Sequence, residues 1–271
     1  LVNSVGFIDM PYRWAGEDPN HFAQYLLQAM AHGAQPSTYV MGTTSQSPYE
    51  ALDLGGRIIR FHRDNQEIYD RLQSTAQVAL VRPGAASDNA ERRKAEFQGL
   101  YLSLIEQHVP FDVIREDHVA NLDPQRFRLV ILADVGTLDP DQVRSLERAL
   151  AAGVRIVATG DSAWEEGVPQ LGPTPLAHQL ATFNTEESVR SLHLDLNQGG
   201  DLAPVVGGFA VLKPASEADT DWPALGRTRY GPPEECYGHD STGHPGWVSG
   251  RVGAGELALV PWRPGLVYRE I

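Results

Sequence analysis

Four side chains that are suited to binding a sugar lie close together near the start of the chain. Asp9 ends the apolar segment SVGFIDM, and Tyr12, Arg13 and Trp14 follow shortly after it. A carboxylate accepts hydrogen bonds from sugar hydroxyls, and an aromatic side chain offers an apolar platform to a sugar ring. We therefore predict that these four residues bind substrate, with Asp9 as the candidate catalytic group. In the alternative interpretation, Asp9 pairs with Arg13 and Trp14 packs on a helix.

The motifs that would complete a catalytic or cofactor site are absent from the sequence. Cleavage of a glycosidic bond needs a second carboxylate, about 5 to 10 Å from the first, and none can be assigned. No G-x-G-x-x-G or G-x-x-x-x-G-K-[ST] occurs, so we expect no nucleotide or other cofactor. Asp161 and Ser162 lack the G-x-S-x-G frame of a serine nucleophile. A small hydrolase that uses them with a histidine is kept as an alternative.

A second candidate site is a loop shaped by glycine and proline, PPEECYGHDSTGHPG, residues 232–246. Loops of this kind often carry function, and we predict that Glu234, Tyr237 and His239 bind substrate. Cys236 with His239 and a later histidine suggests zinc, but the ligand set is incomplete and we expect no metal. The alternative is a loop that lies in solvent or at an interface.

Composition excludes several classes of partner. Acidic residues exceed basic ones by 35 to 22, which gives a net charge of −13 and argues against nucleic acid. No segment has the roughly 20 apolar residues that span a bilayer, so we expect no membrane partner. The single cysteine is compatible with a reducing compartment. We therefore expect a cytoplasmic protein.

The first part of the chain alternates strands and helices. Apolar patterning predicts strands at 4–10 and 37–41 and a helix that begins at Asp18-Pro19 and ends near Ala31. A second helix is predicted to bury one apolar face, formed by Ile58, Phe61, Ile68 and Leu72. Two parallel strands cannot cover both helices by themselves, so the pattern indicates that a neighbouring layer is missing.

From residue 77 the pattern starts again and predicts a doubly wound sheet. We expect strands at 77–83, 111–115, 128–133 and 154–160, with helices opened by Asp88-x-x-Glu91 and by Asp139-Pro140. Beyond Asp161 we expect a β-rich extension, with strands in SVRSLHLDL, VGGFAVL and ELALVPW. The predicted domains are therefore residues 1–75 and 76–271.

Ordered blocks of the sequence resemble a known family. FIDMPYRWAGEDP and YVMGTT are similar to the last two strand–helix units of the catalytic barrel in glycoside hydrolases related to the beta-galactosidases that carry a trimerisation domain. VALVRPG, the segment from LVILADVG to GDSAW, and the closing GPPEECYG, HPGWV and ELALVPWRPGLVY are similar to that trimerisation domain.

The resemblance implies an α/β fold in which the end of a TIM-type barrel precedes a flavodoxin-like, class I amidotransferase-like domain without its catalytic cysteine. It implies a carbohydrate substrate and a homo-oligomer, with a trimer as the form seen in the family. Asp9 matches the position of the family's nucleophilic glutamate, and the acid/base glutamate would lie upstream of Leu1. We therefore expect the chain alone to be inactive and mainly to complete and assemble the site. The alternative is a stand-alone, non-catalytic sugar-binding or regulatory module.

Overall fold

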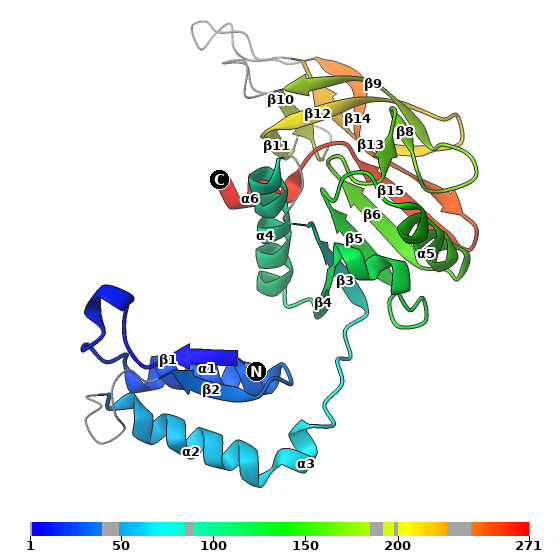
Figure 1. Cartoon of the computed structure of the whole chain (residues 1–271). Coiled ribbons are helices and arrows are strands. Elements are labelled where there is room, and N and C mark those ends of the chain that lie inside the picture. Colours follow the sequence, from blue (N-terminus) through cyan, green and yellow to red (C-terminus); the bar gives the residue numbers. More distant parts are fainter. Residues whose placement is uncertain are drawn as a thin grey trace, which may run out of the picture. The chain divides into compact units, whose positions relative to one another are not determined.

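The computed structural model describes residues 2–39, 49–84, 89–184, 192–197, 200–226 and 240–270. The chain divides into two compact units, Leu1–Thr75 and Ala76–Ile271. Figure 1 shows the elements of both units along the chain. Each unit is described by itself below.

The first unit is built from two parallel strands and the helices that follow them. Strand β1 (Val2–Val5) pairs in parallel with β2 (Pro36–Tyr39). Helix α1 (Pro19–Ala31) lies between them in sequence and packs on α2 (Ala51–Asp64), which is followed by the short α3 (Gln66–Tyr69). As predicted, Asp18 begins α1, because its carboxylate accepts the amide hydrogens of Asn20 and His21 at 2.9 and 3.0 Å.

Two expectations for this unit are wrong. The strand expected at 4–10 ends at Val5, and Met10–Tyr12 forms a 3₁₀ turn instead. The apolar face expected on the second helix is only partly buried: Ile58 packs inward, whereas Phe61, Ile68 and Leu72 are 55%, 64% and 48% exposed.

Helix packing explains why that face is exposed. The buried side of α2 carries small residues, since a Cβ atom added to Gly55 would lie 2.6 Å from the ring of Phe22 in α1. This close approach of the two helices fixes the rotation of α2. Phe61 of α2 and Ile68 of α3 therefore point away from α1.

The second unit contains a nine-stranded mixed sheet, ordered β11-β10-β13-β14-β15-β6-β5-β3-β4. The strands β3 (Val78–Arg82), β4 (Phe111–Arg115), β5 (Leu129–Ala133), β6 (Arg155–Thr159) and β15 (Gly255–Val260) pair in parallel. An antiparallel part continues through β14 (Ser241–Val252), β13 (Asp219–Leu225), β10 (Leu192–Asp195) and β11 (Leu202–Val205). The predicted extension thus shares one sheet with the parallel strands, and its last strand lies beside β6.

Smaller elements complete this unit. The strands β9 (Ala177–Asn184) and β12 (Gly208–Pro214) form a two-stranded sheet, and β7 (Trp164–Glu165) pairs with β8 (Val168–Pro169). The helical elements are α4 (Ala90–Glu106), η2 (Glu116–Asn121), α5 (Pro140–Ala151) and α6 (Pro264–Glu270). As predicted, Asp139 begins α5, and it forms a capping box with Gln142. Asp88 lies outside the described residues, and the residue that begins α4 is Asn89.

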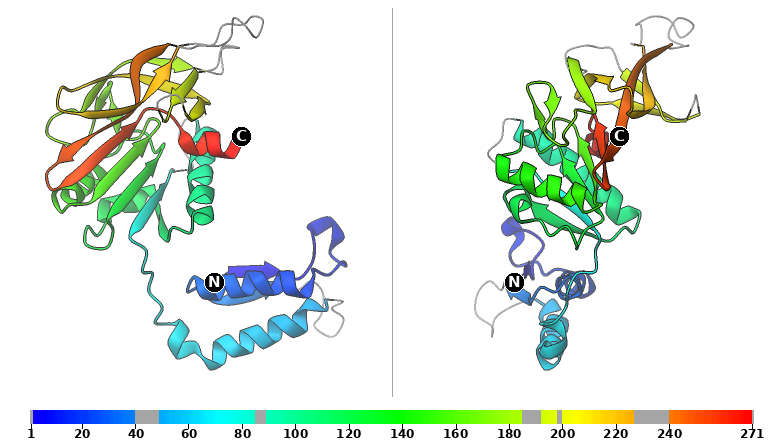
Figure 2. Two further views of the ribbon diagram at one scale, coloured as in Figure 1. Left: turned by 180° about the vertical axis from the view of Figure 1, so that it is seen from behind. Right: turned by 90° about the vertical axis from the view of Figure 1, so that its right-hand side faces the viewer.

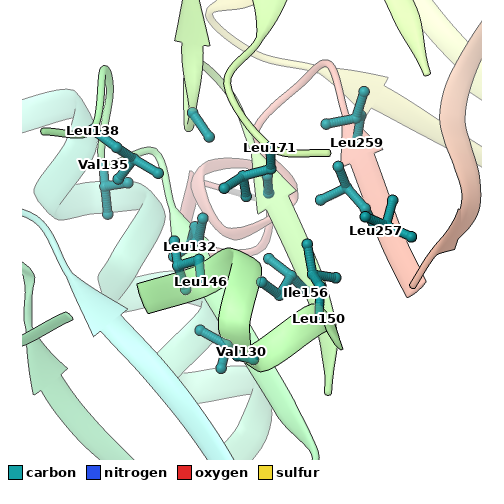
Figure 3. Close-up of a cluster of buried hydrophobic side chains, with 14 of the residues drawn as sticks. Val130, Leu132, Val135, Leu138, Leu146, Leu150, Ile156, Leu171, Leu257 and Leu259 are labelled. Atoms are coloured by element: carbon teal, nitrogen blue, oxygen red, sulfur yellow. The ribbon is translucent and has the colours of Figure 1, made fainter. Parts of the chain in front are cut away.

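Successive side chains of a strand point to opposite faces of the sheet, so each parallel strand can pack against helices on both faces. Leu132 of β5 belongs to the cluster that contains Leu146 and Leu150 of α5 (Figure 3). Its neighbour Ile131 belongs to a second cluster, which packs on Phe97 of α4. The helix α6 lies against α4, on the opposite side of the sheet from α5 (Figure 2).

Candidate functional site

The predicted N-terminal site residues share one short loop between β1 and α1. An isolated bridge pairs Phe7 with Gly16, and the amide of Ile8 donates to the carbonyl of Ala15 at 3.1 Å, so both ends of the loop are held together. Within it, the amide of Tyr12 donates to the carbonyl of Asp9 at 2.8 Å. The loop is therefore closed on itself by backbone hydrogen bonds.

The four side chains of this loop face solvent. Tyr12 and Trp14 are 64% and 77% exposed, and Asp9 and Arg13 are exposed as well. This exposure rules out the alternative in which Trp14 packs on a helix of its unit. The loop presents a carboxylate, a phenol, a guanidinium and an indole, which together offer hydrogen-bond donors, acceptors and apolar planes to a polyhydroxylated ligand.

The second predicted site lies mostly outside the described residues, which omit 227–239 and with them Glu234, Tyr237, His239 and Cys236. Of the rest of that segment, Asp240 is exposed at the start of β14 and His244 is half-buried within it. The described part of the chain holds no group of three or more His, Cys, Asp or Glu residues that could bind a metal ion.

The geometry of Ser162 opposes the serine-hydrolase alternative. In the turn after β6, Gly160 has a left-handed backbone conformation, with φ +59°, and carries no side chain. Ser162 is fully buried; its hydroxyl donates to the carbonyl of Leu132 and accepts the amide hydrogen of Val135, both at 2.9 Å. A hydroxyl held in this way supports the backbone and is not free to attack a substrate.

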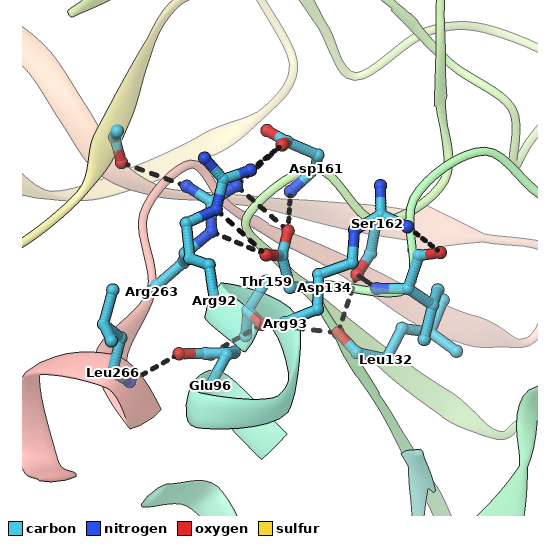
Figure 4. Close-up of polar contacts among 12 residues, drawn as sticks. Arg92, Arg93, Glu96, Leu132, Asp134, Thr159, Asp161, Ser162, Arg263 and Leu266 are labelled. Atoms are coloured by element: carbon cyan, nitrogen blue, oxygen red, sulfur yellow. Dashed lines mark hydrogen bonds and ion pairs between the residues drawn. The ribbon is translucent and has the colours of Figure 1, made fainter. Parts of the chain in front are cut away.

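A polar network, which the sequence analysis missed, lies at the carboxyl ends of β5 and β6 (Figure 4); Asp134, Glu96 and Arg263 are buried in it, whereas Asp161 is exposed. Arg263 is 2% exposed and donates to Asp134 at 2.7 and 3.0 Å and to Asp161 at 2.7 Å. Arg92 of α4 also donates to Asp161, at 3.0 Å. Burial alone would lower the pKa of Arg263, but the hydrogen bond and charge of Asp134 raise it above its ordinary value.

Glu96 extends this network beneath the two strands. It is fully buried, and its carboxylate accepts the Thr159 hydroxyl and the Leu266 amide, both at 2.7 Å. Burial is the main reason why the pKa of Glu96 rises to about 7. These two hydrogen bonds and the charge of Arg263 lower the pKa of Glu96, whereas the charge of Asp134 raises it further.

Two features of the sequence point to the network. Asp134 follows a buried strand directly, and Glu96 interrupts the apolar side of a helix. A charged residue in such a place is almost always paired. In open α/β sheets the carboxyl edge is also where ligands bind, but here the protein's own ion pairs fill it.

Comparisons with known proteins relate the fold to carbohydrate-active enzymes. No protein-family model matches the sequence, and the search of curated proteins found no match. Among solved structures, the beta-galactosidase from Bacillus circulans sp. alkalophilus is similar with a TM-score of 0.70 and 15% identity, over 100% of this chain and 43% of that one. Alpha-L-fucosidase isoenzyme 2 from Paenibacillus thiaminolyticus gives 0.72 and 16%, over 99% and 41%. The exo-beta-1,4-mannosidase Op5Man5 from Opitutaceae bacterium strain TAV5 gives 0.58 and 12%, over 93% and 45%.

These similarities define the class of the fold. The predicted resemblance to beta-galactosidases is confirmed at the level of the fold, and the chain spans about two fifths of the length of the enzymes it matches. No helix of the described residues is both long and apolar enough to cross a membrane.

Proposed function

We propose that the chain is a portion of a glycoside hydrolase related to the beta-galactosidases. In this proposal, residues 1–75 form the end of a β/α barrel, and residues 76–271 form a non-catalytic, amidotransferase-like domain. That domain assembles the enzyme into a homo-oligomer, of which a trimer is the form that the sequence resemblance implies. The sugar site receives side chains from this chain, namely Asp9, Tyr12, Arg13, Trp14, Glu234, Tyr237 and His239.

The observation that carries the proposal is the match of the complete chain to less than half of two glycosidases, 43% of one and 41% of the other. Because identity is 15% and 16%, the match concerns the fold, and the carbohydrate chemistry is inferred from the fact that the two matched proteins are a beta-galactosidase and an alpha-L-fucosidase. The exposed loop with Asp9 and Trp14 supports this inference, since its donors, acceptors and indole suit a sugar.

The first unit supports a barrel origin. Its parallel strands β1 and β2 form a two-stranded sheet, which is marginal without further strands. The exposed Phe61, Ile68 and Leu72 are apolar side chains that neighbouring strand–helix units of a barrel would cover.

The second unit supports a non-catalytic role. Numbered along the chain, its parallel strands run 2-1-3-4-5, the flavodoxin-like order of doubly wound sheets. The turn residue Gly160 has no side chain, and a Cβ atom there would lie 2.4 Å from the carboxylate of Asp134. The place where a nucleophile would stand is thus filled by an ion pair.

The test compares the intact mass of the natural gene product with the 29.7 kDa of this chain and assays both for release of p-nitrophenol from β-galactoside and α-fucoside. We expect a longer product, extended by much of the about 250 residues of a complete barrel, that is active and trimeric by light scattering. This chain alone should be inactive. A natural product of the same mass as this chain would overturn the proposal in favour of a stand-alone sugar-binding module.

The role of the loop is tested in the longer product. We expect Trp14→Ala to lower kcat/KM at least tenfold, because the indole is lost as a sugar platform, while the unfolding midpoint stays unchanged. Leu180→Ala, which truncates a side chain on β9 that is 61% exposed, is the matched control and should leave both unchanged. Equal activity of the two variants would show that Trp14 is not part of the sugar site.

A further inference from the structure

The C-terminal helix α6 is held on α4 by unusually close backbone contact. A Cβ atom added to Gly99 of α4 would lie 1.7 Å from the carbonyl oxygen of Gly265, and one added to Gly265 would lie 2.1 Å from the carbonyl oxygen of Glu96. Both residues are therefore glycine because the two backbones touch. Any change that moves α6 must break this contact.

Glu96 lies directly at this contact and links three elements. Its carboxylate accepts the amide hydrogen of Leu266 in α6 and the hydroxyl of Thr159 in β6, both at 2.7 Å. The side chain has no exposed surface. When α6 leaves α4, the hydrogen bond to Leu266 is lost and the carboxylate becomes accessible to water.

The charged groups near Glu96 lie directly after β5 and β6, on α4, and just before α6. Asp134, at the end of β5, repels an ionised Glu96, and Arg263, which precedes α6, attracts it. Arg263 is already bonded to Asp134 and Asp161, and Arg92 of α4 is also bonded to Asp161. Since these cations are shared among several carboxylates, burial remains the dominant influence on the ionisation of Glu96.

We propose that Glu96 is a proton-dependent latch that seats the C-terminal helix α6 on α4. In the seated state the carboxyl group is buried, which favours its protonated form; in the released state it is solvated, which favours its ionised form. Release of α6 is therefore coupled to loss of a proton. Rising pH therefore weakens the packing of α6 on α4, and mildly acidic pH strengthens it.

Seating of α6 also shapes a surface hollow. Phe97, Gln98, Tyr101 and Leu102 of α4 line it together with Arg269 of α6, and its volume is about 440 Å³. Because Arg269 belongs to α6, the latch makes this edge of the partly aromatic surface depend on pH.

Hydrogen exchange of the α6 amides in the full chain tests the latch. With a pKa of about 7 when α6 is seated and 4.5 when it is released, the opening equilibrium should rise about tenfold from pH 6 to pH 8, after correction for the chemical exchange rate. The amides of α5 provide the internal reference, because α5 forms no hydrogen bond with Glu96 or with α6 among the described residues.

Variants separate the latch from simple packing. Glu96→Gln keeps the shape and the acceptor for Leu266 but cannot ionise, so α6 should open equally at both pH values. Glu91→Gln, an exposed position in the first turn of α4, is the matched control and should retain the tenfold change. Thr159→Val removes a hydrogen bond that lowers the pKa, so it should move the opening to higher pH.

The proposal is overturned if opening of α6 in the unaltered chain does not change between the two pH values. It is equally overturned if Glu96→Gln retains the full change, or if Thr159→Val leaves the pH of opening where it was. A variant that fails to fold is replaced by the other, since each gives an independent readout.

Discussion

Replacing Arg263 with methionine should strongly destabilise the second unit. Arg263 is 2% exposed and donates three hydrogen bonds to carboxylates, two of them to Asp134, which has no exposed surface. In Arg263→Met that carboxylate keeps the amide of Asp161 at 2.8 Å and Arg92 at 3.7 Å but loses its closest cation. Removing one partner of a buried ion pair costs about 3–5 kcal/mol, so we expect the free energy of unfolding to fall by that amount.

Urea denaturation followed by tryptophan fluorescence measures this loss. Four of the five tryptophans lie in the second unit, and Trp262 is next to the substituted residue, so the signal reports the correct unit. The control is Arg144→Met, because the pair of Arg144 with Asp141 is largely exposed and should contribute less than about 1 kcal/mol.

A double substitution tests the reason for the loss. Asp134→Asn combined with Arg263→Met removes the uncompensated charge, so the double variant should be more stable than the sum of the two single losses by about 1–3 kcal/mol. A loss of unfolding free energy below about 1 kcal/mol for Arg263→Met, or the same loss as for Arg144→Met, would refute the conclusion that Arg263 and Asp134 form a buried ion pair in which each charge needs the other.

Two further predictions concern the α4 helix. Since burial raises the pKa of Glu96 from 4.5 to about 7, the folded state binds the proton more tightly, and the contribution of Glu96 to stability should be full below pH 4.5 and lost as pH rises to 7. The difference in unfolding free energy between the unaltered chain and Glu96→Gln should therefore shift by up to about 3 kcal/mol across that window, as measured by urea denaturation, and a shift of opposite sign would contradict it. Gly99→Ala should destabilise by about 2–3 kcal/mol, because its Cβ would lie 1.7 Å from a backbone oxygen that cannot move without moving α6. The control is Gly56→Ala in α2, whose Cβ meets only the flexible Arg60 at 3.3 Å and which should instead stabilise by about 0.5–1 kcal/mol. Equal shifts of the thermal midpoint for the two variants would show that the contact of Gly99 with α6 does not matter.

Local sequence rules located most elements that the structure describes. Asp18-Pro19 and Asp139-Pro140 predicted where α1 and α5 begin, because an aspartate satisfies the free amides of a first helical turn and proline fits there. The apolar segments at 77–83 and 128–133 predicted β3 and β5, since strands buried on both faces are continuously hydrophobic. These rules need only a few neighbouring residues.

The candidate site could be predicted in part. Asp9, Tyr12, Arg13 and Trp14 are adjacent in sequence, so placing them on one loop needed no long-range information. That their side chains face solvent could not be derived, because exposure depends on which surfaces pack on the loop. The same reason explains the error at Phe61 and Ile68, where periodicity identified an apolar face but not the partner of that face.

The sequence by itself determined the acidic character of the chain, the alternation of strands and helices and the resemblance to glycosidase domains, all of which follow from residue types and local order. Only the tertiary structure decided that β15 lies beside β6, that Ser162 supports the backbone, and that Glu96 meets Leu266 across 170 positions of sequence. Such contacts depend on how distant segments fill a common core, and a buried charge reveals its partner only after that core has formed.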